Sequence, residues 1–355
     1  MNATRSAIDL DDVDGLVGAD RDGLLRTAST SGAHVRAAAA AVDEGALESL
    51  AGPQPRTVIW IAGRGTAATA GRMVSALVGQ VAGSPIMVAS GAPPWIGPLD
   101  VVVVAGDDAG DPALVAAASM AARRGARLLV VAPFEGPLAD AAAGRSAVLA
   151  PRLPLDDAFG LTRYLAAGLA AVAAVDDAVR ADLGALADEV DAEVLRSSAG
   201  REVFTNPAKA LAGRMVSRRV VLAADSSAAL ALAHHGSSVL FRVAGNVAAA
   251  AGLADVVIAL RSDVPGAVTD SVGALFHDEQ IDGPLPDRPR VLALTLNDER
   301  PVVAARTAGL DDFDLVGAED IADPATVGIG SADAQLAVLA VRLEMAAVYL
   351  RLIRG

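Results

Sequence analysis

The chain has 355 residues, and its composition already excludes several classes of protein. It contains no cysteine, which rules out disulfides, thiolate nucleophiles and thiolate metal sites. Its net charge of −14 disfavours a nucleic-acid or anionic-membrane partner, because both require clustered Lys and Arg. Its apolar residues, rich in alanine, never form the roughly 18-residue uncharged run of a membrane span. The acidic first 20 residues lack the pattern of a secretory signal, so we expect a cytoplasmic protein.

The first half of the chain alternates strand-like and helical patterns. Apolar, β-branched runs without polar alternation are typical of parallel strands buried on both faces. Five such runs alternating with helices predict a doubly wound parallel sheet. The expected helices cover residues 21–49, 66–81 and 112–124, and the expected strands cover 57–62, 85–89, 100–105, 127–132 and 147–150.

The second half repeats this alternation after a purely helical stretch. Residues 157–196 are helical in pattern, with a break at Asp176 and Asp177. We therefore predict an α/β fold of two tandem doubly wound parallel-sheet domains joined by a helical segment, with boundaries at 1–155, 156–202 and 203–355. The expected strands are 219–223, 255–260, 290–296 and 313–316, and the expected helices are 227–242, 299–308 and 331–354.

The turn after the first strand is a candidate ligand-binding loop. Gly63, Arg64, Gly65 and Thr66 connect a strand to a helix, where backbone N–H groups can cradle an anion. The glycines permit close approach, and the Thr66 hydroxyl can cap the helix. The same residue types also occur in ordinary βα turns, so both interpretations stay open.

An acidic loop follows the strand at residues 100–105. Asp107, Asp108 and Asp111 stand where a phosphate-binding α/β protein usually places hydroxyls and glycines. These carboxylates would repel a phosphate that the helix terminus would otherwise attract. We expect Asp107 and Asp108 to contact a ligand of another kind.

Two polar segments in the second half allow either a structural or a binding role. Asn206 and Pro207 are a typical helix start, with Asn206 as the cap. Ser226 and Ser227 follow the strand at 219–223 in the place that the first glycine turn takes in the first half. They can bind an anion or cap the next helix.

A histidine beside acids in a loop is the best candidate for proton transfer. His277 lies next to Asp278 and Glu279, and an imidazole there can act as a general acid or base on a sugar oxygen. A lone loop histidine can equally be solvated. His234 and His235 lie in the middle of an expected helix, where packing or capping explains them. Because no histidines are paired at helical spacing, we expect no metal, and no feature calls for a cofactor.

Several segments together resemble the bifunctional phosphoglucose/phosphomannose isomerases, which are sugar isomerase (SIS) domain proteins. The resemblance covers the chain from about residue 50 onward and is closest to a divergent actinobacterial branch. It implies a homodimer that binds a small-molecule sugar or sugar phosphate. The segments are GRGTAATAG at 63–71, AFG at 158–160, NPAKALA at 206–212, FHDEQIDG at 276–283 and RLEMAAVYLRLIRG at 342–355.

The resemblance also implies which catalytic groups have changed. In that family a turn hydroxyl and a Ser/Thr loop hold the phosphate, an Arg assists, a Glu moves the proton and a His aids ring opening. Here Thr66 can supply one hydroxyl, the Ser/Thr loop falls on the acidic residues 106–111, and Asp156 stands where the Arg is expected. Gly245 falls where the Glu is expected, and His277 corresponds to the family's His. Isomerisation needs a positioned base, which Gly does not offer.

Three functions follow as hypotheses. The first is an isomerase-like protein with weakened or lost catalysis that binds a carbohydrate derivative or a partner. The second is an active aldose–ketose isomerase of glucose 6-phosphate and mannose 6-phosphate that uses His277 with Glu279 or Glu202, and Arg64 or Arg242 for the phosphate. The third is a sensor or assembly subunit that dimerises through helices.

Overall fold

The computed structural model describes residues 8–142, 144, 146–154, 156, 158–262, 289–320 and 330–354. The chain forms two compact units that are not continuous in sequence. The first unit is Met1–Asp22, Arg196–Ile329 and Arg342–Gly355, and the second is Gly23–Leu195 and Gly330–Val341. The division at residues 155 and 202 stays a prediction.

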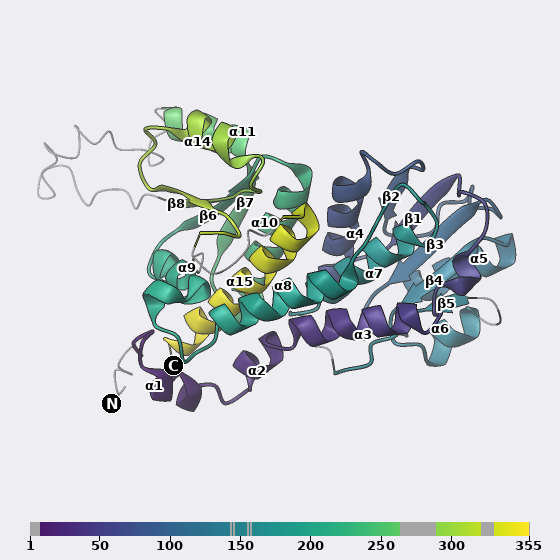
Figure 1. Ribbon diagram of the computed structural model, residues 1–355, viewed down its shortest axis with the longest axis horizontal. Helices are drawn as coiled ribbons and strands as arrows, with labels where there is room; N and C mark the ends of the chain where they lie inside the picture. The colour runs from purple at the N-terminus through teal and green to yellow at the C-terminus, as the bar shows by residue number, and fades with distance from the viewer. Residues whose placement is uncertain are drawn as a thin grey trace, which may run out of the picture. The chain divides into compact units, whose positions relative to one another are not determined.

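The second unit contains a five-stranded parallel sheet (Figure 1). The strand order is β2-β1-β3-β4-β5, so the chain winds from the centre to one edge and then to the other. The predicted doubly wound sheet is therefore confirmed. Its strands are β1 (Thr57–Ile61), β2 (Ile86–Ala89), β3 (Asp100–Ala105), β4 (Arg127–Val131) and β5 (Ser146–Val148).

Helices cover both faces of this sheet. The alternating β-strand side chains Ile59, Val102 and Val130 pack against α5 and α6, while α7 packs against α4, α3 and β4. Burial on both faces explains why these strands are apolar throughout. The helices and one 3₁₀ turn are α2 (Leu24–Ala28), α3 (Ser31–Asp43), η1 (Glu48–Leu50), α4 (Gly65–Val78), α5 (Pro112–Arg124), α6 (Gly136–Ala141), α7 (Leu161–Ala173) and α8 (Leu183–Arg196).

Two glycines let α4 and α7 approach Trp60 of β1. A Cβ added at Gly71 of α4 would lie 2.3 Å from Trp60 Cδ1, and one at Gly168 of α7 would lie 2.7 Å from Val74 Cγ2 and 3.0 Å from Trp60 Cζ3. The indole N–H of Trp60 donates to the carbonyl oxygen of Ala67 at 2.9 Å. The buried indole is thus satisfied, and the glycines provide the room for it.

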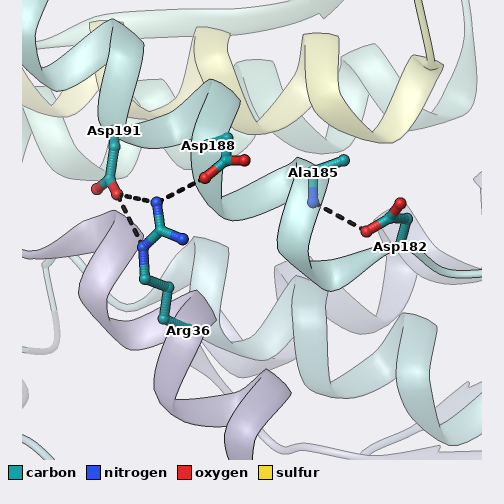
Figure 2. A network of polar contacts seen from close by, with 5 residues as sticks. All are labelled: Arg36, Asp182, Ala185, Asp188 and Asp191. Carbon is teal, nitrogen blue, oxygen red and sulfur yellow. Dashed lines mark hydrogen bonds and ion pairs between the residues drawn. The ribbon is translucent and has the colours of Figure 1, made fainter.

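An arginine joins α3 to α8 in the same unit (Figure 2). Arg36 donates through Nε and Nη2 to Asp191 at 3.0 and 2.6 Å and through Nη2 to Asp188 at 2.7 Å. Asp182 accepts from the backbone N–H of Ala185 at 2.9 Å and so caps the first turn of α8. This polar network lies on the exposed side of the two helices, because the Arg36 side chain is 51% exposed.

The first unit contains a four-stranded parallel sheet in the order β7-β6-β8-β9. The described strands repeat the winding of the first four strands of the other sheet, which confirms the predicted repetition of topology. The strands are β6 (Val220–Ala224), β7 (Ala248–Gly252), β8 (Arg290–Leu294) and β9 (Phe313–Val316). The helices and one 3₁₀ turn are α1 (Val13–Ala19), η2 (Val203–Thr205), α9 (Pro207–Met215), α10 (Ser227–Ala244), α11 (Leu253–Arg261), α14 (Arg300–Thr307) and α15 (Ala332–Leu352), whose first residues belong to the other unit.

The strand predicted at 255–260 is wrong. Those residues form α11, and the strand is the alanine run β7 just before them. β7 carries little intrinsic strand preference, and its pairing with β6, from Val220 with Ala248 to Ala224 with Gly252, makes it a strand. Asp255 in the first turn of α11 favours the helix through the helix dipole.

Several buried polar side chains in the first unit have partners within that unit. Asn206 caps α9 by accepting from the N–H of Lys209 at 2.9 Å, as the sequence predicted. The ammonium of Lys209 donates to the carbonyl oxygens of Ala199 and Arg201 at 2.8 and 2.7 Å. Burial lowers the pKa of Lys209 and raises that of the neighbouring Tyr349 to about 12. His235 of α10 and Glu344 of α15 meet at 2.8 Å with both side chains buried, which gives His235 the structural role expected of it.

Candidate functional site

A pocket opens at the carboxyl ends of β1, β3 and β4. These strands are neighbours in the sheet, and their order places the change of winding direction between β1 and β3. Ligands of doubly wound proteins bind at this kind of position. The pocket has a volume of about 690 Å³, within the range of small-molecule sites. Its lining residues are Arg64, Asp107, Asp108, Ala109, Gly110, Pro133, Glu135, Gly136 and Pro137.

The loop after β1 contributes the pocket's cation. Arg64 stands at the N-cap position of α4 in an extended conformation, and its side chain is 71% exposed. Gly63 and Gly65 flank it with open space where a side chain would be, and Gly65 has a φ of +66°, which favours glycine. The loop therefore keeps the guanidinium accessible.

The predicted capping role of Thr66 is wrong. α4 begins at Gly65, so Arg64 holds the N-cap position and Thr66 is already the second helical residue. The side chain of Arg64 makes no cap hydrogen bond to α4. Thr66 is only 6% exposed and is not among the residues that line the pocket.

The loop after β3 contributes carboxylates whose geometry is partly fixed. Asp108 accepts from the N–H of Gly110 at 2.7 Å. Asp111 caps α5 by accepting from the N–H of Ala113 at 2.8 Å, and its other oxygen lies 3.6 Å from Arg64 Nη2. Asp107 and Asp108 are exposed, whereas the side chain of Asp111 is only 16% exposed. The loop thus presents two carboxylates to the pocket and turns a third against Arg64.

The loop after β4 completes the pocket, and the sequence analysis missed it. Pro133, Glu135, Gly136 and Pro137 all line the cavity. The sequence carried only a local signal, because two prolines and a glycine directly after the strand expected at 127–132 mark a loop but not the loops beside it. Glu135 adds one more carboxylate to the site.

The charge of the lining favours some ligands over others. Arg64 is the one basic residue among the lining residues, which also include three acidic ones. Carboxylates accept hydrogen bonds from hydroxyl and ammonium groups, whereas a phosphate dianion would meet like charge. Among the described residues, no group of three or more His, Asp or Glu is placed to hold a metal ion.

In the other sheet, the turn after β6 corresponds to the turn after β1, and its residues make structural contacts. The hydroxyl of Ser226 accepts from the N–H of Ala229 at 3.3 Å and caps α10, which favours the capping interpretation. Ser227 is exposed as the first residue of α10. Asp225 beside them pairs with Arg306 at 2.7 Å. A ligand-binding role for Ser226 and Ser227 stays a prediction.

None of the remaining candidates that the structure describes is among the residues lining this pocket. His277 and Glu279 lie outside the described residues, as does the FHDEQIDG segment. Glu202 and Arg242 are both exposed and belong to the other unit. Of the predicted ligand-binding set, the pocket brings together Arg64, Asp107 and Asp108.

Two positions where the resemblance implied lost catalytic groups have local structural roles. Gly245 ends α10 in the left-handed conformation, with a φ of +64°. Asp156 accepts from the N–H of Ala158 at 2.8 Å. The left-handed backbone conformation therefore explains the glycine at position 245, as it usually does for a glycine that ends a helix.

No protein-family model matches the chain, and no curated protein matches its sequence. None of the described helices combines the length and apolar character needed to cross a membrane.

Solved structures match nearly the whole chain. The chain is similar to a glucose-6-phosphate isomerase like protein from Thermus thermophilus, with a TM-score of 0.55 and 21% identity over 98% of this chain and 96% of that one. It is similar to a provisionally named phosphosugar isomerase from Bacillus subtilis, with a TM-score of 0.59 and 16% identity over 92% and 95%. It is also similar to the C-terminal domain of glucosamine-fructose-6-phosphate aminotransferase from Francisella tularensis, with a TM-score of 0.58 and 10% identity over 96% of each chain. The protein therefore has the two-sheet α/β fold of the SIS-type phosphosugar isomerase structures, and at these identities the likeness concerns the fold alone.

Proposed function

We propose that this protein binds a carbohydrate derivative in the pocket at the end of β1, β3 and β4, and that its isomerase catalysis is weakened or lost. The observation that carries the proposal is the pocket itself, because Arg64, Asp107, Asp108 and Glu135 meet there around about 690 Å³. Sugars present many hydroxyl donors, and carboxylates are their strongest neutral-pH acceptors in proteins. The matched solved structures include proteins named for phosphosugars, which supports a sugar as the ligand class.

The weakened catalysis rests on the groups that the pocket offers. Aldose–ketose interconversion needs a base held against a carbon acid and a counter-charge for the phosphate. Gly245 stands where the resemblance implies the base, and it carries no side chain. The phosphate would lie against the acidic loop, where repulsion opposes binding. Both features argue for binding without efficient turnover.

An active aldose–ketose phosphosugar isomerase is the second candidate. The accessible guanidinium of Arg64 favours it, since arginine is well suited to phosphate recognition. In this candidate His277 and Glu279 would move the protons. Under either proposal the protein would serve hexose or mannose phosphate metabolism in the cytoplasm as a homodimer, on the strength of the sequence resemblance.

Two measurements on the purified protein separate these candidates. In a coupled assay with glucose 6-phosphate, mannose 6-phosphate and fructose 6-phosphate, the first proposal expects turnover at or near background. Clear turnover that disappears in His277→Ala and Glu279→Gln would establish the second candidate instead.

Thermal-shift measurements test binding directly, because a ligand of the native state raises the melting temperature. The screen compares glucose, mannose, fructose and glucosamine with their 6-phosphates. We expect a shift with at least one sugar that is reduced in Asp107→Ala, which removes a pocket carboxylate. Asp177→Ala, which removes an exposed carboxylate outside the pocket lining, is the matched control. If no sugar shifts the melting temperature, or if both variants respond alike, the proposal of this pocket as a sugar site fails.

A further inference from the structure

The carboxylate of Asp111 lies between two positive groups that could bind an external anion. One is the N-terminus of α5, a helix of 13 residues, where Asp111 accepts from the N–H of Ala113 at 2.8 Å. The other is Arg64, whose Nη2 lies 3.6 Å from the second carboxylate oxygen.

We propose that Asp111, through its contact with the pocket residue Arg64, is a specificity-determining residue that acts as a built-in anion and excludes ligands carrying a phosphate on the Arg64 side of the pocket. A helix N-terminus and an adjacent arginine are the usual components of a phosphate site. Here the Asp111 carboxylate already contacts both groups. One oxygen accepts from the N-terminus of α5, and the other lies beside Arg64. The inference rests on the proposed function in one respect, namely that the ligand occupies the same pocket.

Burial and anchoring keep the carboxylate in place. The Asp111 side chain is 16% exposed, and its cap bond fixes it to α5 whether or not Arg64 stays close. Arg64, by contrast, is 71% exposed and can turn toward a ligand. An incoming phosphate would therefore meet the guanidinium only beside a fixed carboxylate, whose negative charge opposes its binding.

This arrangement identifies the class of ligand. A neutral or amino sugar can use the carboxylates of Asp107, Asp108 and Glu135 as acceptors without approaching Asp111. Its phosphate ester cannot place the phosphate at the N-terminus of α5. The pocket should therefore prefer the unphosphorylated sugar.

The decisive experiment restores the anion position and probes it with inorganic phosphate. Asp111→Ser keeps a side chain that caps helices well while removing the charge, and Asp111→Asn does the same with nearly the same shape. Calorimetric titration with phosphate, against sodium chloride of equal ionic strength, should show at least a roughly tenfold tighter Kd in both variants than in the wild type, the change expected when a charged hydrogen bond is gained. Adding Arg64→Gln to Asp111→Ser should remove the gain.

Asp108→Ser is the matched control, because it removes a carboxylate of the same loop that is not paired with Arg64. It should gain less than either Asp111 variant. The proposal is overturned if neither Asp111 variant binds phosphate more tightly than the wild type, or if Asp108→Ser gains as much. Because the probe contains no sugar, the two proposals can fail separately. Tighter phosphate binding in the Asp111 variants without any sugar binding would uphold this inference and reject the proposed function. Sugar binding without tighter phosphate binding would uphold the proposed function and reject this inference.

Discussion

The guanidinium of Arg56 and the carboxylate of Asp100 meet through two hydrogen bonds, Nε to Oδ1 at 3.0 Å and Nη2 to Oδ2 at 2.6 Å. Arg56 directly precedes β1 and Asp100 begins β3, and these strands are neighbours in the sheet. The Asp100 side chain is fully buried and also accepts from the N–H of Gly97 at 2.8 Å. Hydrogen bonding to Asp100 raises the pKa of Arg56. The pair therefore links the amino-terminal ends of β1 and β3. These ends lie opposite to the carboxyl ends where the pocket opens.

Removing this carboxylate should destabilise the protein. In Asp100→Ala the partly buried N–H of Gly97 and the Nε and Nη2 donors of Arg56 lose their acceptor, and a hydrogen bond to a charged group contributes about 1.5–3 kcal/mol. We expect a loss of that size in the free energy of unfolding, measured by urea denaturation. Asp107→Ala, an exposed carboxylate of the same unit, should change it by no more than about 0.5 kcal/mol. Equal effects of the two substitutions would contradict the structural role of Asp100.

Gly168→Ala should destabilise the protein even though alanine is the better helix former. The new methyl group would collide with Val74 and Trp60 between α7 and α4. Overpacking of a core contact costs about 1–3 kcal/mol, more than the roughly 1 kcal/mol that helix propensity returns. We therefore expect a lower melting temperature, measured by circular dichroism.

Gly18→Ala is the control for that substitution. Gly18 lies within α1, and nothing stands within 4 Å of the added Cβ. Helix propensity alone should then act, giving a gain of up to about 1 kcal/mol. If Gly18→Ala and Gly168→Ala shift the melting temperature in the same direction, close packing at Gly168 is not what requires the glycine.

Arg36→Ala should have a small, salt-dependent effect. The ion pairs of Arg36 with Asp188 and Asp191 are exposed, and pairs of this kind contribute about 0–1 kcal/mol (Figure 2). Salt screens exposed charges, so the difference from the wild type should shrink between low and high sodium chloride concentrations. A loss of several kcal/mol, or one unaffected by salt, would contradict this interpretation of the α3–α8 network.

His34 should make stability fall in mild acid. Burial, and secondarily the charge of Arg163, lowers the pKa of His34 from its ordinary value of 6.5. The unfolded chain then takes up a proton that the folded protein resists, so stability is present above pH 6.5 and is lost as the pH falls toward the folded-state pKa. Urea denaturation should show the stability of the wild type relative to His34→Gln decreasing from pH 7 to pH 5.

His234→Gln provides the comparison, because His234 lies on the exposed side of α10. Its difference from the wild type should change less with pH than that of His34→Gln. A constant difference between the wild type and His34→Gln across this range would show that His34 does not couple protonation to unfolding.

The sequence by itself determined the elements whose signals are local. The β-branched runs of β1 and β3, the Pro112 start of α5 and the Asn206 cap of α9 all lie within a few residues of the structure that they specify. Such patterns act through backbone preference and the alternation of faces, which need no distant partner. The alternation of strand and helix was then sufficient to predict two parallel sheets.

Only the tertiary structure decided the features that depend on distant partners. The alanines of β7 became a strand because β6 offers them a ladder, while the more β-branched residues after them became a helix. Arg64 meets Asp111, and Arg64 shares a pocket with Glu135, because parallel strands bring the loops after β1, β3 and β4 to the same end of the sheet. Pairing energy and charge proximity arise only when segments far apart in the chain are brought together, so no local pattern could have revealed them.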